Sequence, residues 1–155
     1  MIKVQQKDFD YGFEVSALSK GNHSVGGVCA FRGLVRDMVG NKQINNLSLE
    51  HYPGMTEKCL SKIEAEAHRR WLLEKTLIIH RYGLLKPGDQ IVLVAVSSAH
   101  RDAAFEACRF MIDYLKTEAP FWKLESTAEN SQWVEAKDKD KQAHSRWLNN
   151  LKKDK

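Results

Sequence analysis

The stretch that decides the fold reads QIVLVAVSSAHRDAAFEACRFMIDYLKTEAP and runs from Gln90 to Pro120. Its first part, Gln90–Ser98, contains the longest apolar run of the chain and predicts a buried strand. The following part has apolar residues every three or four positions, which predicts an amphipathic helix. Its inner positions are Ala104, Cys108, Met111, Ile112 and Leu115. Pro120 ends this helix, because the residue before a proline avoids the helical conformation.

The same reasoning, extended outward, places a second long helix and several short strands. Apolar residues at positions 55, 59, 60, 63, 67 and 71 predict an amphipathic helix over Met55–Trp71. The other predicted strands are Ile2–Gln6, Gly26–Val35, Ile44–His51, Thr76–Tyr82, Phe121–Ser126 and Gln132–Ala136, and the predicted short helices are Tyr11–Lys20 and Gln142–Leu151. A turn at Gly40-Asn41 makes Ile44–His51 the strand that returns after Gly26–Val35.

This order of elements favours an α+β fold. Short hairpins mixed with two long helices predict a sandwich, in which a mixed, mostly antiparallel sheet carries the helices on one face. No repeat, low-complexity segment or linker divides the 155 residues, so we expect a single domain.

The charge of the chain is concentrated at its end. Lys and Arg number 24 against 20 Asp and Glu, a net charge of +4. Residues 1–136 are neutral, and the whole excess lies in residues 137–155. We expect a solvated, fraying terminus there, and a basic arm that touches a polyanion stays open as the alternative.

The cysteines and the apolar runs indicate the cellular compartment of the protein. No signal peptide is recognisable, and the apolar run Ile91–Val96 is too short to span a membrane. Cys29, Cys59 and Cys108 form no CxxC pair, so neither a disulfide framework nor a thiolate zinc site is expected. They are interpreted as small buried residues, although a catalytic cysteine stays open. The sequence predicts a cytoplasmic protein.

Cationic side chains recur where elements end. Arg36 closes a strand, His100-Arg101 joins a strand to a helix, and Lys116 and Lys123 stand on either side of Pro120. Such positions often carry binding sites, and arginine suits phosphate or carboxylate. Together they indicate a site for a small anion, although each alone is compatible with an ordinary surface charge. Lys116 also suits the negative end of the helix dipole.

Other site classes have less support. The six histidines include no pair three or four residues apart, so no metal is predicted. There is no P-loop, no dinucleotide fingerprint and no aromatic-basic stripe for nucleic acid. Ser97 and Ser98 lie near His100 without the glycine elbow of a serine hydrolase. For Glu50-His51, a structural hydrogen bond and a catalytic role both stay open.

Three motifs together resemble a known family, the large, catalytic subunits of molybdopterin synthase. The motifs are LEHYPGMT (Leu49–Thr56), SSAHR with AFEA (Ser97–Ala107), and DYLKT with APFWK (Asp113–Lys123); PGD (Pro87–Asp89) and WVEA (Trp133–Ala136) also fit. The resemblance covers about Val25 to Trp147. It implies a catalytic domain over residues 1–147, with residues 148–155 left as a flexible basic tail.

The resemblance implies an α/β hammerhead fold and a sulfurtransferase activity. The family installs the dithiolene sulfurs of molybdopterin on cyclic pyranopterin monophosphate (precursor Z). The sulfur comes from a thiocarboxylate on the C-terminal Gly-Gly of a small ubiquitin-like subunit. Two large subunits form a central homodimer, which carries one small subunit at each end. No cofactor, metal, nucleic acid or membrane is implied.

The resemblance also assigns roles to residues. Arg36 corresponds to a substrate-contacting arginine, His100-Arg101 to an anion-binding pair, and Lys116 and Lys123 to the lysines nearest the chemistry. Leu124-Glu125 continue the wall of the site that Lys116 and Lys123 form. We expect Lys116 to be the more critical lysine, as a general acid/base or as an electrostatic stabiliser. Leu34 departs from the family, which often has a basic residue there, so a substrate contact is in question at that position.

Two rival functions remain at the level of the sequence. A non-enzymatic phosphate- or nucleotide-binding regulatory module would use the same arginines without lysine chemistry. A nucleic-acid-binding protein would use the basic terminus and would show a steep dependence of affinity on salt.

Overall fold

The strand predicted in the first part of Gln90–Pro120 is one of the two inner strands of a four-stranded sheet. The computed structural model describes residues 1–128, 130–134 and 138–150. In it, β8 (Gln90–Ser98) has β6 (Lys75–Arg81) on one side and β2 (Gly27–Leu34) on the other, both antiparallel to it. The edge strand β1 (Ile2–Gln5) pairs with β6 in parallel, with Ile2 opposite Ile78. The sheet order is therefore β1-β6-β8-β2.

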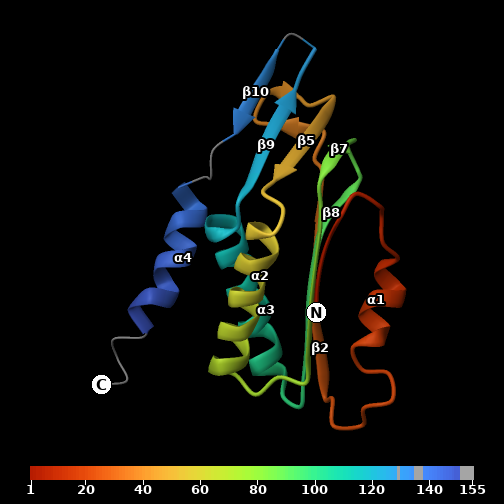
Figure 1. The fold of residues 1–155 in the computed structure, drawn as a ribbon, viewed down its shortest axis with the longest axis vertical. Helices are drawn as coiled ribbons and strands as arrows, with labels where there is room; N and C mark the ends of the chain where they lie inside the picture. The colour runs from red at the N-terminus through yellow and green to blue at the C-terminus, as the bar shows by residue number, and fades with distance from the viewer. Residues whose placement is uncertain (129, 135–137, 151–155) are drawn as a thin grey trace.

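Helices cover both faces of this main sheet, which explains why β8 has an unbroken apolar run from Ile91 to Val96. On one face lie α2 (Met55–Arg70) and α3 (Arg101–Glu118), and on the other lies α1 (Tyr11–Ala17) (Figure 1). Alternate residues of β8 enter two separate cores. Val92, Val94 and Val96 pack with α2 and α3, and Leu93 and Ala95 pack on the face of α1. The predicted α+β fold is confirmed, but the expectation that the helices lie on one face of the sheet was wrong, because α1 covers a second core on the other face.

A second, smaller sheet stands at one end of the molecule (Figure 1). It consists of β10 (Ser131–Val134), β9 (Phe121–Ser126), β5 (Asn46–His51) and β7 (Gly83–Leu85), in that order. The prediction that Ile44–His51 returns after Gly26–Val35 as its hairpin partner was wrong. Instead, β5 pairs with β9 and β7, since its Leu47 and Leu49 form a third core with Val35 and Leu85.

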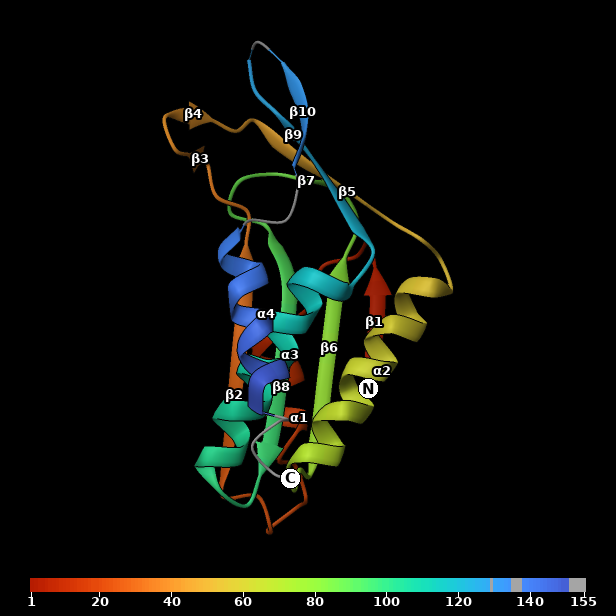
Figure 2. The same cartoon turned by 90° about the vertical axis from the view of Figure 1, so that its left-hand side faces the viewer.

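A short hairpin occupies the expected turn at Gly40-Asn41. Its strands are β3 (Met38–Val39) and β4 (Lys42–Gln43), which pair only with each other among the described residues. Gly40 has a φ of 62°, a backbone conformation that favours glycine. Figure 2 shows this hairpin beside the second sheet.

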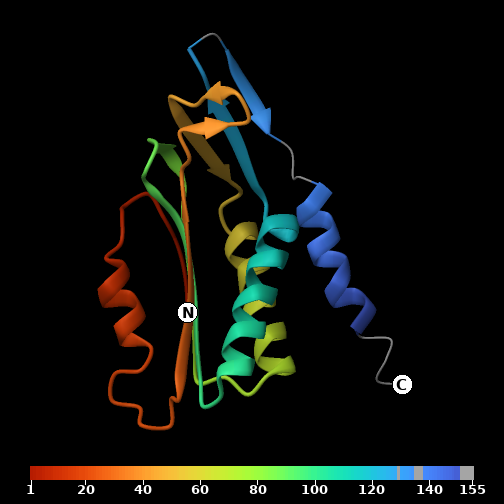
Figure 3. The same ribbon diagram turned by 180° about the vertical axis from the view of Figure 1, so that it is seen from behind.

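The charged terminus is more ordered than the sequence indicated. Residues Asp138–Asn150 form α4, which packs along α3 (Figure 3). Trp147 is 4% exposed and packs edge-on against Trp71 and Phe110, and its Nε1–H donates to Asp113 Oδ2 at 2.8 Å. The expected fraying is therefore wrong for these residues. The proposed boundary after Trp147 falls inside this helix, and residues 151–155 lie outside the described part of the chain.

Candidate active site

Three of the predicted site residues line one cavity between the two sheets. Arg36, Lys123 and Glu125 surround a space of about 110 Å³, and the other lining side chains are apolar. One guanidinium, one ammonium and one carboxylate in an otherwise apolar wall suit a small anionic ligand that also needs a proton donor or acceptor.

The alternation of strand β9 decides which of its side chains reach this cavity. Lys123 lies opposite Leu49, and Glu125 lies opposite Leu47, so both lysine and glutamate share the face of the third core. Leu124 lies between them and faces the other side of the sheet. The expectation that Leu124 continues the wall of the site with Glu125 therefore does not fit the geometry, because Leu124 is absent from the described lining.

The turn Pro87-Gly88-Asp89 holds the strand end that carries Arg36. The backbone N–H of Val35 donates to the carbonyl of Asp89 at 2.9 Å, and the N–H of Gly88 donates to the carbonyl of Val35 at 2.8 Å. Gly88 has a φ of 90°, so this turn favours glycine. Because Val35 is buried and bonded on both sides, the exposed Arg36 beside it starts from a fixed backbone position.

Lys116 does not line the cavity. It lies in the last turn of α3 and pairs with Asp140 of α4, with an Nζ–Oδ1 distance of 3.6 Å. Its side chain is 43% exposed, so the ion pair is screened by water. The structure thus groups Lys123 with Arg36, and it places Lys116 on the side of α3 that faces α4.

His100 and Arg101 lie at the opposite end of the molecule. His100 is the N-cap of α3 and Arg101 is its first residue, and the fifteen helical steps from Arg101 to Lys116 span about 22 Å. Strand β2 gives the same result, because its first residue, Gly27, lies beside Arg101 and its far end leads to Arg36. The Arg101 side chain is 87% exposed. The start of α3 and strand β9 lie toward opposite ends of the molecule (Figures 1 and 2), so one chain does not bring His100-Arg101 together with Lys123.

Two histidines that the sequence did not assign to the site lie behind Lys123. His80 is buried and stacks on Phe121, with ring centroids 3.6 Å apart at 16°. The pKa of His80 is lowered to about 4, mainly by burial and to a smaller extent by the positive charges of Lys123 and His51, while the hydrogen bond to the Arg81 carbonyl acts in the opposite direction. In the sequence, His80 sits in an apolar strand with no distinguishing spacing, so nothing marked it as a site residue.

A larger cavity, of about 740 Å³, contains none of the predicted site residues. It lies at the open edge of the main sheet, between α1, β1 and α2. Its polar groups bind one another: Lys3 pairs with Glu14 at 2.6 Å, and the hydroxyl of Thr76 donates to Glu64 at 2.6 Å. The arrangement is that of a structural ion-pair network.

Other kinds of centre have no support in the described part of the chain. No group of three potential metal ligands occurs there, and the three cysteines are unpaired. No described helix is both long and apolar enough to cross a bilayer.

Comparison with known proteins identifies the family. The MoaE protein family matches residues 4–118. The chain belongs to this family. A molybdopterin synthase catalytic subunit from Pseudomonas aeruginosa is 53% identical over 146 residues, which cover 94% of this chain and 97% of the relative. The resemblance stated from the motifs is thereby confirmed, and the chain is an enzyme subunit.

Solved structures agree with this assignment. A molybdopterin biosynthesis MoaE protein from Burkholderia ambifaria is 49% identical, with a TM-score of 0.82 over 96% of this chain and 97% of that one. A molybdopterin synthase from Staphylococcus aureus is 32% identical, with a TM-score of 0.80 over 86% of this chain and 96% of that one. The fold is therefore that of the MoaE proteins.

Proposed function

We propose that this chain carries out the sulfur transfer of molybdopterin synthase at the cavity lined by Arg36, Lys123 and Glu125. The joint lining of that cavity is the observation that supports this location. The pterin substrate brings a phosphate, for which the fork of Arg36 is suited. The sulfur donor is a thiocarboxylate, and its transfer passes through a tetrahedral acyl centre that nearby cations stabilise.

The two lysines have separate tasks in this proposal. Lys123 acts inside the cavity, where it stabilises negative charge on the acyl centre or moves a proton. Lys116 approaches from the surface of α3 to act as the general acid/base or electrostatic stabiliser beside the thiocarboxylate, and its ion pair with Asp140 opens when the carrier tail enters. An exposed ion pair of this kind contributes less than about 1 kcal/mol, so incoming ligand readily replaces it.

His100 and Arg101 join the site through a second copy of the chain. Within one chain they lie about 22 Å from Lys116, too far to hold the same small substrate. Their position at the start of α3, next to the start of the edge strand β2, leaves them accessible to a neighbour. The central homodimer expected for the family supplies that neighbour.

The partner is a small ubiquitin-like protein that ends in a Gly-Gly thiocarboxylate. A catalytic subunit of this family is one part of a two-part enzyme, and a flexible glycine tail is narrow enough for a cavity of about 110 Å³. The reduced cysteines are in keeping with work in the cytoplasm.

The test is molybdopterin formation by Lys116→Ala, with purified thiocarboxylated partner and precursor Z. The rate is expected to fall by about a hundredfold or more, the usual loss when a general acid/base is removed. Lys62→Ala, an exposed lysine on α2, is the matched control and is expected to keep the wild-type rate. Near-normal turnover by Lys116→Ala would contradict the role of this lysine.

A further inference from the structure

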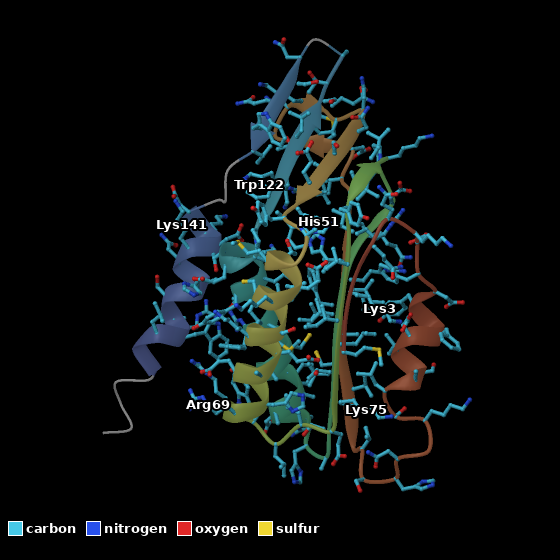
Figure 4. The ribbon with its side chains drawn as sticks, in the orientation of Figure 1. Lys3, His51, Arg69, Lys75, Trp122 and Lys141 are labelled. Carbon is cyan, nitrogen blue, oxygen red and sulfur yellow. The ribbon has the colours of Figure 1, made fainter. Side chains whose placement is uncertain are left out.

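A buried imidazole supports the lysine in the cavity. His80 lies on β6 of the main sheet, and Phe121, on which it stacks, begins β9 of the second sheet. His51, the last residue of β5, is labelled in Figure 4. It lies opposite Phe121 on β9, and its ring packs against that of Tyr82 with the centroids 4.4 Å apart. These rings fill the junction between the two sheets directly behind the cavity.

The hydrogen bonds of His80 decide which ring nitrogen is available. Its Nδ1 lies 2.9 Å from the backbone carbonyl of Arg81. A carbonyl only accepts hydrogen bonds, so Nδ1 carries the proton. Burial keeps the ring neutral, because its pKa is lowered to about 4. In this tautomer, Nε2 has a lone pair and acts as an acceptor.

Lys123 is in the right place to use that acceptor. Residues 121 and 123 share one face of β9 and lie about 7 Å apart along the strand. The His80 ring is stacked on the first of these side chains, which leaves the ring within reach of the long side chain of Lys123. In keeping with this placement, the positive charge of Lys123 contributes to the lowered pKa of His80.

We propose that His80 is a positioning residue for Lys123: its Nε2 accepts a hydrogen bond from the Lys123 ammonium and holds the amine at the cavity. The Phe121 stack fixes the plane of the imidazole, and the bond to Arg81 fixes its tautomer. His51 packs beside the stacked rings of His80 and Phe121, with its ring centroid 6.2 Å from that of Phe121. A neutral acceptor suits this place, because a second cation would repel the lysine.

This proposal rests on the function proposed for Lys123, so its test includes a measurement that needs no substrate. The acetylation rate of the Lys123 amine at neutral pH is measured by mass spectrometry, with the exposed Lys42 as internal reference. A hydrogen bond to the ammonium favours the charged form, which does not react. His80→Phe, which keeps the stack but lacks Nε2, is expected to raise the Lys123 rate about threefold to tenfold.

Two further variants distinguish the roles of the two ring nitrogens of His80. His80→Gln places an amide oxygen near the position of Nε2, and His80→Asn keeps only a donor near the position of Nδ1. We expect the glutamine variant to retain much of the wild-type labelling rate and kcat, whereas the asparagine variant resembles His80→Phe. The KM for precursor Z is expected to stay unchanged in all three. His23→Gln, in an exposed loop, is the control.

The outcomes are distinct. If folded His80→Phe labels Lys123 at the wild-type rate, or if asparagine rescues as well as glutamine, the proposal is overturned. If labelling changes as expected while Lys123→Ala retains full sulfur transfer, the contact stands and the function proposed for Lys123 fails. A fall in kcat that follows only a loss of folded protein, measured by thermal melting, also contradicts the positioning role.

Discussion

At the scale of single residues, Gly26 is the glycine at which an added Cβ would come closest to another part of the backbone. A Cβ on this residue would lie 2.2 Å from the carbonyl oxygen of Ala99, in the loop that leads into α3. Because the clashing atom belongs to the backbone, it cannot move away as the end of a flexible side chain could. The start of β2 and the start of α3 can therefore approach this closely only because residue 26 has no side chain.

We expect Gly26→Ala to lower the free energy of unfolding by about 1–3 kcal/mol, the usual cost of forcing extra atoms into a packed site. Urea denaturation measures the change. Gly27→Ala is the matched control, since its Cβ would come no closer than 4.0 Å to a neighbour, Arg101 Cα. Equal costs for the two variants would contradict the steric argument.

The buried His80 makes stability depend on pH. Its pKa is about 4 in the folded chain and about 6.5 when the chain unfolds, so the unfolded state binds the extra proton between these values. Stability is full above pH 6.5 and falls as the pH drops towards 4, by at most about 1.4 kcal/mol per pH unit.

Urea denaturation of the wild type and of His80→Phe, at several pH values from 7 to 4, measures this contribution. The phenylalanine variant does not titrate there, so wild type is expected to lose stability relative to it as the pH falls. A constant difference between the two would show that His80 is not buried in its neutral form.

At the scale of elements, the sequence predicted the helices and strands whose formation depends on the local spacing of apolar residues. The apolar periodicity of Met55–Trp71 and the run in Gln90–Ser98 appear as α2 and β8 almost residue for residue. Strand pairing was not predictable in the same way. Leu47 and Leu49 alternate correctly for any sheet, and β5 joins the second one through its pairing with β9 and β7 and through the core that these leucines form with Val35 and Leu85.

Helix α4 shows the same limit. Its sequence is rich in charge, and one large residue, Trp147, decides its position. We expect Trp147→Ala to lower the free energy of unfolding by about 3–5 kcal/mol, since it removes the ring that packs between Trp71 and Phe110. Chemical denaturation measures the loss.

Leu148→Ala is the control for that variant. Leu148 is the next residue along α4 but is 47% exposed, so its truncation is expected to cost less than about 0.5 kcal/mol. A similar cost for both substitutions would mean that α4 does not pack through Trp147.

At the scale of the whole molecule, the motifs predicted a set of site residues, and the fold separates them. The separation was readable from the sequence, because Arg101 and Lys116 were predicted to share one helix and are fifteen residues apart. What the sequence lacked was the contribution of the tertiary packing. The contact of His80 with Phe121 joins strands 40 residues apart through two different sheets, and no local spacing reports it.

A site shared between two copies makes a sharp prediction. Lys123→Ala and Arg101→Ala are each expected to be inactive alone. When the two are unfolded and refolded together, each mixed dimer contains one intact site. About a quarter of the wild-type rate is then expected, because random pairing makes about half of the dimers mixed. If each site used residues of one chain only, the mixture would stay inactive.

The parallel pairing of β1 with β6 has a consequence for synthesis. Ile2 leaves the ribosome 76 residues before its partner Ile78. At translation rates of about 5–20 residues per second, the first strand waits about 4–15 s for its neighbour. Strand β2 waits comparably long for β8, since Gly27 pairs with Ser98. Two apolar strands are thus exposed together inside the cell, and this interval is when chaperones are most needed.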